Sequence, residues 1–188
     1  MTTDTDQYLS AFGKRMSEIR ERGSIRAAVK RGAVDLNDLT VNPYVYRGFP
    51  DNSRGNGYPS AAELAFRDTL CLYASLASGG KDVHTPKSGD LGKSLSNLAY
   101  ARGNLPSQDT RTLRMHNRMV SAKTREEIMR SVTEMSKAAI RGGVGVDFFK
   151  LARDLRRMYS TQEQASSVVS RWSTSYSITK ESAGENES

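Results

Sequence analysis

Apolar residues in the C-terminal half of the chain recur at the spacing of an α-helix. The stretch 125–141 carries a core-facing stripe whose members step by four, three and four residues, namely Ile128, Val132, Met135 and Ala139. Thr124 and Glu127 form a capping box at its start, in which each side chain accepts a backbone N–H that the helix leaves without a partner. Gly142 and Gly143 follow the last apolar position and end the predicted helix.

Two flanking stretches pair an apolar face with a basic face. If one helix continues through 111–125, four arginines lie within roughly 60° of one another, Arg111, Arg114, Arg118 and Arg125. The opposite, apolar face of that helix would hold Leu113, His116 and Val120. The stretch 148–159 repeats the arrangement, with a basic stripe of Lys150, Arg153 and Arg157 and an apolar stripe of Phe148, Leu151, Ala152 and Leu155.

The N-terminal third begins with two predicted helices and continues as irregular chain. A helix from Thr5 places four apolar side chains on one face, Tyr8, Phe12, Met16 and Ile19. Gly23 breaks it, and Ser24 is the expected N-cap of a short second helix that carries the basic residues Arg26, Lys30 and Arg31. Residues 32–59 are rich in Pro, Gly and Asn and predict a long loop, held to the body by Tyr44, Tyr46 and Phe49.

The remaining elements are also helical. Ser60 and Glu63 form a capping box that opens a helix to about Ala77, apolar on most sides and therefore expected to be buried. After a polar loop at 78–90, the stretch 91–102 turns Leu91, Leu95 and Leu98 inward. A third capping box, Ser160 with Glu163, opens a last helix whose apolar residues are Val168, Val169, Trp172 and Tyr176.

No stretch alternates with the period of a β-strand, so the sequence predicts an all-α fold. We expect a bundle of about seven to nine helices in two packed lobes, without a sheet. An N-terminal lobe would cover 1–106, with its long loops at 32–59 and 78–90, and a C-terminal lobe with a basic face would cover 107–178. The polar, acidic segment 179–188 is expected to be a disordered tail.

The charge of the chain is positive and unevenly placed. The 188 residues carry a formal net charge of +7. Residues 107–160 hold 12 basic and 6 acidic side chains, and residues 1–32 hold 7 and 4. A concentrated positive field attracts polyanions such as nucleic acid or an anionic membrane. The apolar faces are narrow, and most of the cations are arginines, whose planar fork suits phosphate, so we expect nucleic acid rather than a membrane.

The sequence offers little material for catalysis or metal binding. Gly92-Lys93-Ser94 looks like the end of a phosphate loop, but Lys87 stands where that motif needs an earlier glycine. His84 lies in the polar loop without ligands at metal spacing, and His116 lies on an apolar stripe as a hydrogen-bonded core residue. Asp147 is better explained as a helix N-cap than as half of a catalytic pair with Asp154. We therefore expect no enzyme, no metal and no cofactor.

The cellular compartment follows from what the sequence lacks. Cys71 is the single cysteine and cannot form an internal disulfide, which fits a reducing environment. The N-terminus has no apolar signal core, and no run of about 18 apolar residues occurs. A soluble, cytoplasmic protein is the expectation.

Several segments together resemble a known family. They are GSIRAAVKRG (23–32), LGKSLSNL (91–98), VDFFKLARDL (146–155) and SRWSTSY (170–176). Their order and spacing over about residues 8–178 are similar to the CasB family, the small subunit of the type I-E CRISPR surveillance complex Cascade. The most specific element is the run at 146–155.

The resemblance implies a non-catalytic subunit that stabilises the R-loop in antiviral defence. In the family, two copies lie head to tail and contact the guide RNA–target DNA hybrid, the displaced non-target strand, and the backbone-repeat and large subunits. The family's basic contacts would fall on Lys30, Arg31, Lys93, Arg114, Arg130 and Arg153. The basic stripes and the short second helix add Arg26, Arg111, Arg118 and Arg157 as candidate nucleic-acid-binding residues.

Two other functions remain open from the sequence. One is a stand-alone helical protein that binds RNA or DNA. The other is a purely structural adaptor subunit whose basic face pairs with an acidic protein. These two and the Cascade subunit share the same basic surface and differ in what it meets.

Overall fold

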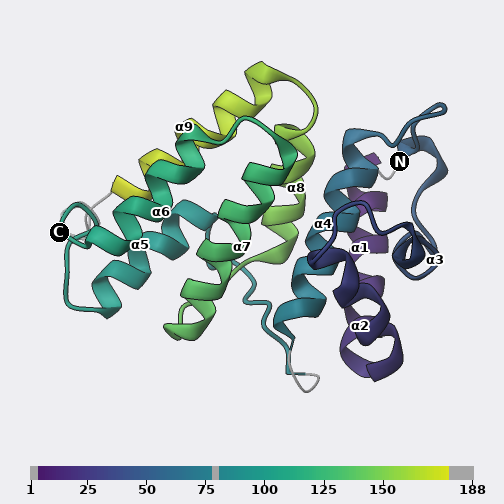
Figure 1. Ribbon diagram of the computed structural model, residues 1–188, viewed down its shortest axis with the longest axis horizontal. Helices are drawn as coiled ribbons and strands as arrows, with labels where there is room; N and C mark the ends of the chain where they lie inside the picture. Colours follow the sequence, from purple (N-terminus) through teal and green to yellow (C-terminus); the bar gives the residue numbers. More distant parts are fainter. Residues whose placement is uncertain (1–3, 78–80, 178–188) are drawn as a thin grey trace, which may run out of the picture. The chain divides into compact units, whose positions relative to one another are not determined.

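The computed structural model describes residues 4–77 and 81–177, and over these residues the chain is all-α (Figure 1). It forms nine α-helices and three short 3₁₀ turns there, and no β-strand. The predicted fold class is confirmed, with the number of helices at the upper end of the expected range. None of the described helices is long and apolar enough to cross a lipid bilayer.

The chain divides into two compact units. Unit 1 comprises residues 1–84 and 148–165, with the helices α1 (Asp4–Glu21), α2 (Gly23–Lys30), α3 (Asn42–Val45), α4 (Ala61–Leu76) and α8 (Phe148–Met158). Unit 2 comprises residues 85–147 and 166–188, with α5 (Leu91–Ala101), α6 (Thr110–Ser121), α7 (Arg125–Arg141) and most of α9 (Gln162–Ser177).

The boundaries of the units differ from the lobes 1–106 and 107–178 expected from the sequence. Helix α5 packs against α6 and α7 and so joins unit 2, whereas α8 packs against α4 and joins unit 1. Each unit therefore contains two separate stretches of chain. The expected disordered tail, 179–188, lies outside the described residues.

Helix α4 is the centre of unit 1, as its apolar sequence predicts. Helices α1, α2 and α8 all pack against it (Figure 1). Phe66 of α4 makes edge-to-face contacts with Tyr8 and Phe12 of α1 and with Phe49 of the loop that precedes α4. All four apolar residues predicted for the buried face of α1 are buried, Tyr8, Phe12, Met16 and Ile19.

The segment between α2 and α4 is more ordered than a plain loop. Besides α3 it contains three 3₁₀ turns, η1 (Arg31–Ala33), η2 (Leu39–Val41) and η3 (Asp51–Ser53). Phe49 is buried and Tyr46 packs edge-to-face on it, as predicted, but Tyr44 is 42% exposed and does not hold the loop through its ring.

Arg67 and Asp68, two buried charged residues of α4, form the contacts that fix this segment to the helix. Arg67 donates from Nη2 to the carbonyl oxygen of Asp38 at 2.9 Å, and its Nη1 lies 3.4 Å from the carboxylate of Asp68. Asp68 also accepts a hydrogen bond from the Tyr159 hydroxyl at 3.0 Å. Because each charge is compensated inside the unit, α4 can bury both, and the chain around Asp38 is fixed to it.

Capping side chains set the ends of several helices. The boxes Ser60–Glu63 and Thr124–Glu127 are both present, which confirms two of the three predictions. The third is wrong, because α9 begins at Gln162 and Thr161 Oγ1 accepts from the Gln164 N–H at 3.2 Å. The N-cap predicted at Ser24 is also wrong. Helix α2 begins at Gly23, and its N-cap Arg22 makes no side-chain capping bond.

The buried face of α6 is not the predicted one. Thr112, Met115 and Met119 are buried, whereas Val120 is 42% exposed at the helix end. Thr112 can be buried because its hydroxyl donates to the Asp109 carbonyl oxygen and lies 3.1 Å from the Tyr176 hydroxyl of α9. Hydrophobicity alone favoured Leu113, His116 and Val120, and it could not reveal a hydrogen-bond partner 64 residues away.

Gly92 has a packing role rather than the phosphate-binding role suggested by the Gly-Lys-Ser sequence. A Cβ atom at this position would lie 2.0 Å from the carbonyl oxygen of Trp172. The neighbouring Ser94 Oγ donates to the Gly145 carbonyl oxygen at 2.8 Å. The glycine therefore lets α5 approach the backbone of α9, and the serine holds the linker before α8.

We expect Gly92→Ala to lower the free energy of unfolding by about 2 kcal/mol, because the clash with a backbone atom outweighs the gain in helix propensity. Asn97→Ala, on the same helix, is the control and should change stability by less than about 0.5 kcal/mol. Urea unfolding monitored by circular dichroism measures both. Equal stability of the two variants would contradict the close approach of α5 to α9.

Candidate nucleic-acid interface

Helix α6 presents three arginines to solvent. Asp109 begins the helix by accepting the Thr112 N–H at 2.8 Å. Arg111, Arg114 and Arg118 follow at spacings of three and four, and all three are exposed. Arg125, the fourth member of the predicted stripe, belongs to α7 instead, because α6 ends at Ser121.

Helix α7 carries a second charged stripe that packs beside the first. Arg130, Glu134, Lys137 and Arg141 step by four, three and four residues, so they share the face opposite the buried stripe. The resemblance alone pointed to Arg130, and sequence reasoning missed Lys137 and Arg141. The signal was available, since the spacing of this stripe equals that of the apolar stripe already recognised on α7.

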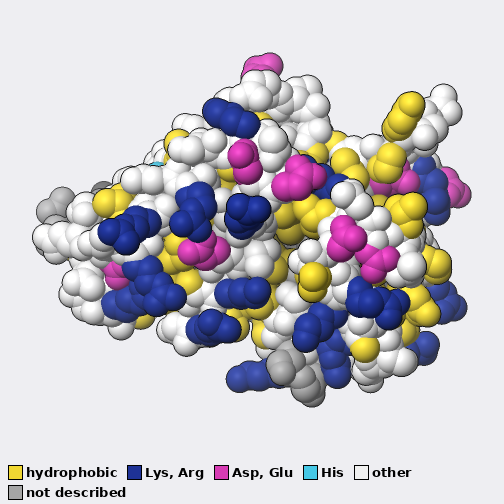
Figure 2. Space-filling view, viewed as in Figure 1, with side chains coloured by type: hydrophobic (Ala, Val, Ile, Leu, Met, Phe, Trp, Pro, Cys, Tyr) yellow, Lys and Arg dark blue, Asp and Glu magenta, His cyan; other side chains and the backbone are white. Residues whose placement is uncertain are grey.

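The two stripes meet through an ion pair between Arg118 of α6 and Glu134 of α7. We call Arg111, Arg114, Arg118 and Arg130 together the basic face. Figure 2 shows Lys and Arg side chains gathered over α5, α6 and α7, with fewer acidic ones among them. The pair offsets part of the repulsion between like charges on the two helices, but both partners are exposed, so it contributes little to stability.

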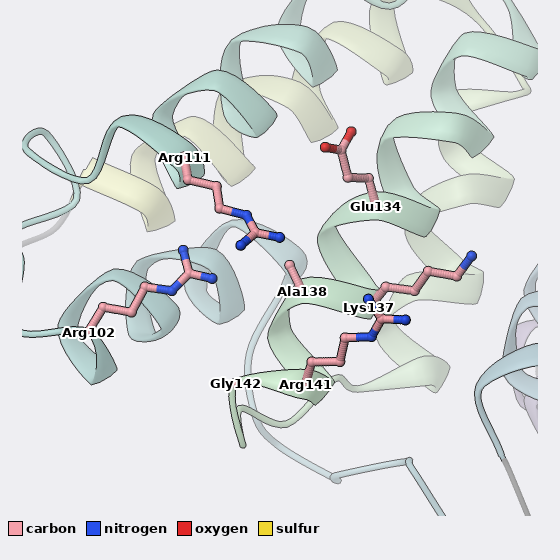
Figure 3. Close-up of a pocket in the computed structure, with 7 residues that line it drawn as sticks. All are labelled: Arg102, Arg111, Glu134, Lys137, Ala138, Arg141 and Gly142. Atoms are coloured by element: carbon pink, nitrogen blue, oxygen red, sulfur yellow. The ribbon is translucent and has the colours of Figure 1, made fainter.

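A cavity of about 550 Å³ opens beside the basic face (Figure 3). Seven residues line it, Arg102, Arg111, Glu134, Lys137, Ala138, Arg141 and Gly142. Helices α5, α6 and α7 all contribute to it. We call this feature the basic pocket.

Asp109 also contacts Arg102, which lines the basic pocket. Its carboxylate lies 3.5 Å from Nη1 of Arg102. Burial raises the pKa of Asp109, but the Thr112 N–H and the charge of Arg102 outweigh it and keep the pKa below the ordinary value of 3.8. The carboxylate is therefore ionised at neutral pH and joins the start of α6 to the end of α5.

The other six of the ten predicted site residues lie in unit 1 or away from the basic face. Lys30 and Arg31 are exposed where α2 ends, and Arg153 and Arg157 are exposed on α8. Helices α2 and α8 both pack against α4 and lie on different sides of it in Figure 1. Lys93 is half-buried near the start of α5 in unit 2.

Arg26 has a structural role. It is half-buried, and its Nη1 donates to the carbonyl oxygens of Ile19 at 3.3 Å and Arg20 at 2.9 Å. These carbonyls belong to the last turn of α1, which the guanidinium therefore caps. Contact with a phosphate would compete with these bonds.

Both histidines have structural partners. His116 Nε2 lies 3.0 Å from the Ser173 hydroxyl, and its ring stacks on Tyr176. His84 Nδ1 accepts the backbone N–H of Phe148 at 3.2 Å. No group of three His, Cys, Asp or Glu side chains that could hold a metal ion occurs in the part of the chain that the structure describes.

Comparison with known proteins gives a family and a fold. The family model of the CRISPR-associated protein Cse2 matches residues 25–176. No curated protein matches the chain.

Solved structures share the fold at low identity. CasB from Thermobifida fusca is similar with a TM-score of 0.67 at 18% identity, over 92% of this chain and 98% of that one. A CRISPR-associated Cse2-family protein from Thermus thermophilus gives 0.65 at 20% identity, over 93% and 98%. A chain of a CRISPR RNA-guided surveillance complex gives 0.63 at 21% identity, over 90% and 91%.

Because the pKa of Asp109 is lowered on folding, its charge stabilises the protein above its unfolded pKa and ceases to do so as the pH falls through the folded value. Asp109→Asn keeps a capping side chain but loses the charge. We expect wild type to be more stable than this variant at pH 7, and the difference in stability to shrink as the pH falls through the lowered pKa of the folded protein. Urea unfolding from about pH 7 to about pH 2.5 measures it. A difference independent of pH would show that the charge does not matter.

Proposed function

Because the chain belongs to the CRISPR-associated protein Cse2 family, we propose that it is the non-catalytic small subunit of a type I-E Cascade surveillance complex. In this role it binds the backbones of guide RNA, target DNA and the displaced strand, and so stabilises the R-loop in antiviral defence. The observation that carries the proposal is the basic face, formed by two packed helices that turn exposed arginines to the same side.

The chemistry of the basic face suits backbone binding without sequence readout. Arg111, Arg114 and Arg130 are exposed guanidinium groups, which form paired hydrogen bonds with phosphate. Phosphate contacts position a protein on nucleic acid but carry no sequence information. An R-loop exchanges one duplex for another of similar stability, so a few such contacts shift the balance.

The proposed contact residues extend over both units. They are Lys30, Arg31, Arg153 and Arg157 in unit 1, and Lys93, Arg111, Arg114, Arg118 and Arg130 in unit 2. Arg26 joins them only if it leaves the carbonyls that it caps.

Assembly would turn weak contacts into useful ones. About five neutralised phosphates give a free protein a Kd of only about 10⁻⁴ to 10⁻⁶ M at physiological salt. Held beside the same nucleic acid by backbone-repeat and large subunits, and repeated in a second copy placed head to tail, the same residues act at high effective concentration. The fold shared with a chain of a surveillance complex supports an assembled role.

The proposal assigns no reaction to the chain and places it in the cytoplasm with its nucleic-acid partners. Two observations support a non-catalytic role. The side chains of His84 and His116 are engaged in structural hydrogen bonds, and Cys71 is buried, away from a substrate in solvent.

Charge reversal tests the basic face. Arg114→Glu with Arg130→Glu should raise the Kd of the assembled complex for target DNA by at least about tenfold, since attractive phosphate contacts become repulsive. Both residues are exposed, so the thermal unfolding temperature should stay within a few degrees. Gel-shift titration of the reconstituted complex measures the effect.

The matched control is Lys14→Glu with Lys123→Glu. It changes the net charge by the same amount, at exposed positions outside the basic face. This pair should change the Kd by less than about threefold. An unchanged Kd for target DNA in the Arg114 and Arg130 variant would show that the basic face does not bind the target.

Salt dependence separates the proposed function from an adaptor that binds an acidic protein. For the isolated protein on single-stranded DNA between about 50 and 200 mM salt, the logarithm of the binding constant should fall linearly with that of the salt concentration. Arg114→Gln with Arg130→Gln should make the slope shallower by about 1.4, or about 0.7 for each lost phosphate contact. An unchanged slope would favour the adaptor, whose interface would have an apolar core.

A further inference from the structure

We propose that the basic pocket is a binding site for a compact polyphosphate, two or three linked phosphate groups, which adjoins the basic face and shares Arg111 with it. This inference does not rest on the proposed function. It rests on four cationic side chains and one carboxylate from three helices around a single concave space.

Three of the four cations have no acidic partner among residues 4–77 and 81–177. Arg102 is paired with Asp109, and the one carboxylate of the pocket, Glu134, is paired with Arg118 from outside it. Arg111, Lys137 and Arg141 have no such ion pair there, which leaves about three positive charges for a ligand. A diphosphate or triphosphate carries a matching charge in a volume that a pocket of about 550 Å³ accommodates.

The end of α7 does not need these cations. Its last carbonyl groups accept backbone N–H groups of the following turn, from Gly142 to Ala138, from Gly143 to Ile140, and from Val144 to Ala139. Lys137 and Arg141 are therefore not required to cap the helix. Their long, exposed chains can turn to a ligand at low cost.

Figure 3 shows how the side chains are placed. Arg102 and Arg111 project from α5 and α6 toward α7, whereas the side chains of Lys137 and Arg141 extend from α7 away from them in this view, so these two turn toward the pocket when a ligand binds. A planar guanidinium from each of two walls can hold neighbouring phosphate groups. None of the seven lining residues is aromatic, so the pocket offers no platform for a base, and the ligand is recognised by its phosphates.

Isothermal titration with sodium tripolyphosphate tests the site, without divalent cations and at fixed ionic strength. The wild-type protein should bind one equivalent of tripolyphosphate, and should bind it more tightly than sulfate. Lys137→Gln with Arg141→Gln should raise the Kd at least about fivefold, since two charge-assisted hydrogen-bonding groups are lost. Unfolding temperatures should agree, because both side chains are exposed.

The control is Lys14→Gln with Lys123→Gln, which loses the same charge elsewhere on the surface. Its Kd should stay within about twofold of wild type. Any of three results would refute the site. They are a rise in Kd below about fivefold for the Lys137 and Arg141 variant, an equal rise in the control, and tripolyphosphate binding that is no tighter than sulfate binding.

Competition identifies the source of the phosphates. An RNA with a 5′-triphosphate that displaces tripolyphosphate better than the same RNA with a 5′-hydroxyl identifies a strand end, and equal displacement identifies a free small polyphosphate. Arg114 and Arg130 do not line the pocket. Their variant can therefore fail in target binding while tripolyphosphate still binds, and the two proposals can be refuted separately.

Discussion

The carboxylate of Asp109 joins two of the helices that carry the charged surface of unit 2. By accepting the Thr112 N–H it begins the helix, and the helical repeat then turns Arg111, Arg114 and Arg118 outward. The same carboxylate lies against Arg102, which lines the basic pocket from the end of α5. One buried acid thus orders cations on two helices, which would otherwise gain from moving apart because like charges repel.

The buried faces of α6 and α7 hold these charges together against that repulsion. Met115 and Met119 of α6 and Val132 and Met135 of α7 are almost fully buried, and removing apolar surface from water supplies the favourable free energy. The ion pair of Arg118 with Glu134 adds little, being exposed. The basic face is therefore a consequence of packing on the opposite sides of the two helices.

Local patterns predicted most of the helices, and three of the errors, at α6, at the basic pocket and at Gly92, have a common cause. The spacing of apolar residues and the capping residues identified α1, α4, α5 and α7, because these signals lie within a few residues of one another. They failed at α6, where Thr112 is buried through a hydroxyl of α9. They also missed the basic pocket, because its walls come from three helices whose packing no spacing encodes. The packing role of Gly92 escaped prediction for the same reason, since its neighbour is the distant Trp172.

The fixed loop of unit 1 has an energetic consequence for Lys30 and Arg31. Arg67 holds the Asp38 carbonyl, and Gly32 is buried so close to α4 that a Cβ would lie 2.6 Å from the Cys71 sulfur. The turn that carries the two cations is thus ordered when the chain folds. An anion that binds there meets a preorganised backbone and loses little of its binding free energy to conformational entropy. A small helical protein can in this way present charge on a stiff support far from its arginine-rich helices in sequence.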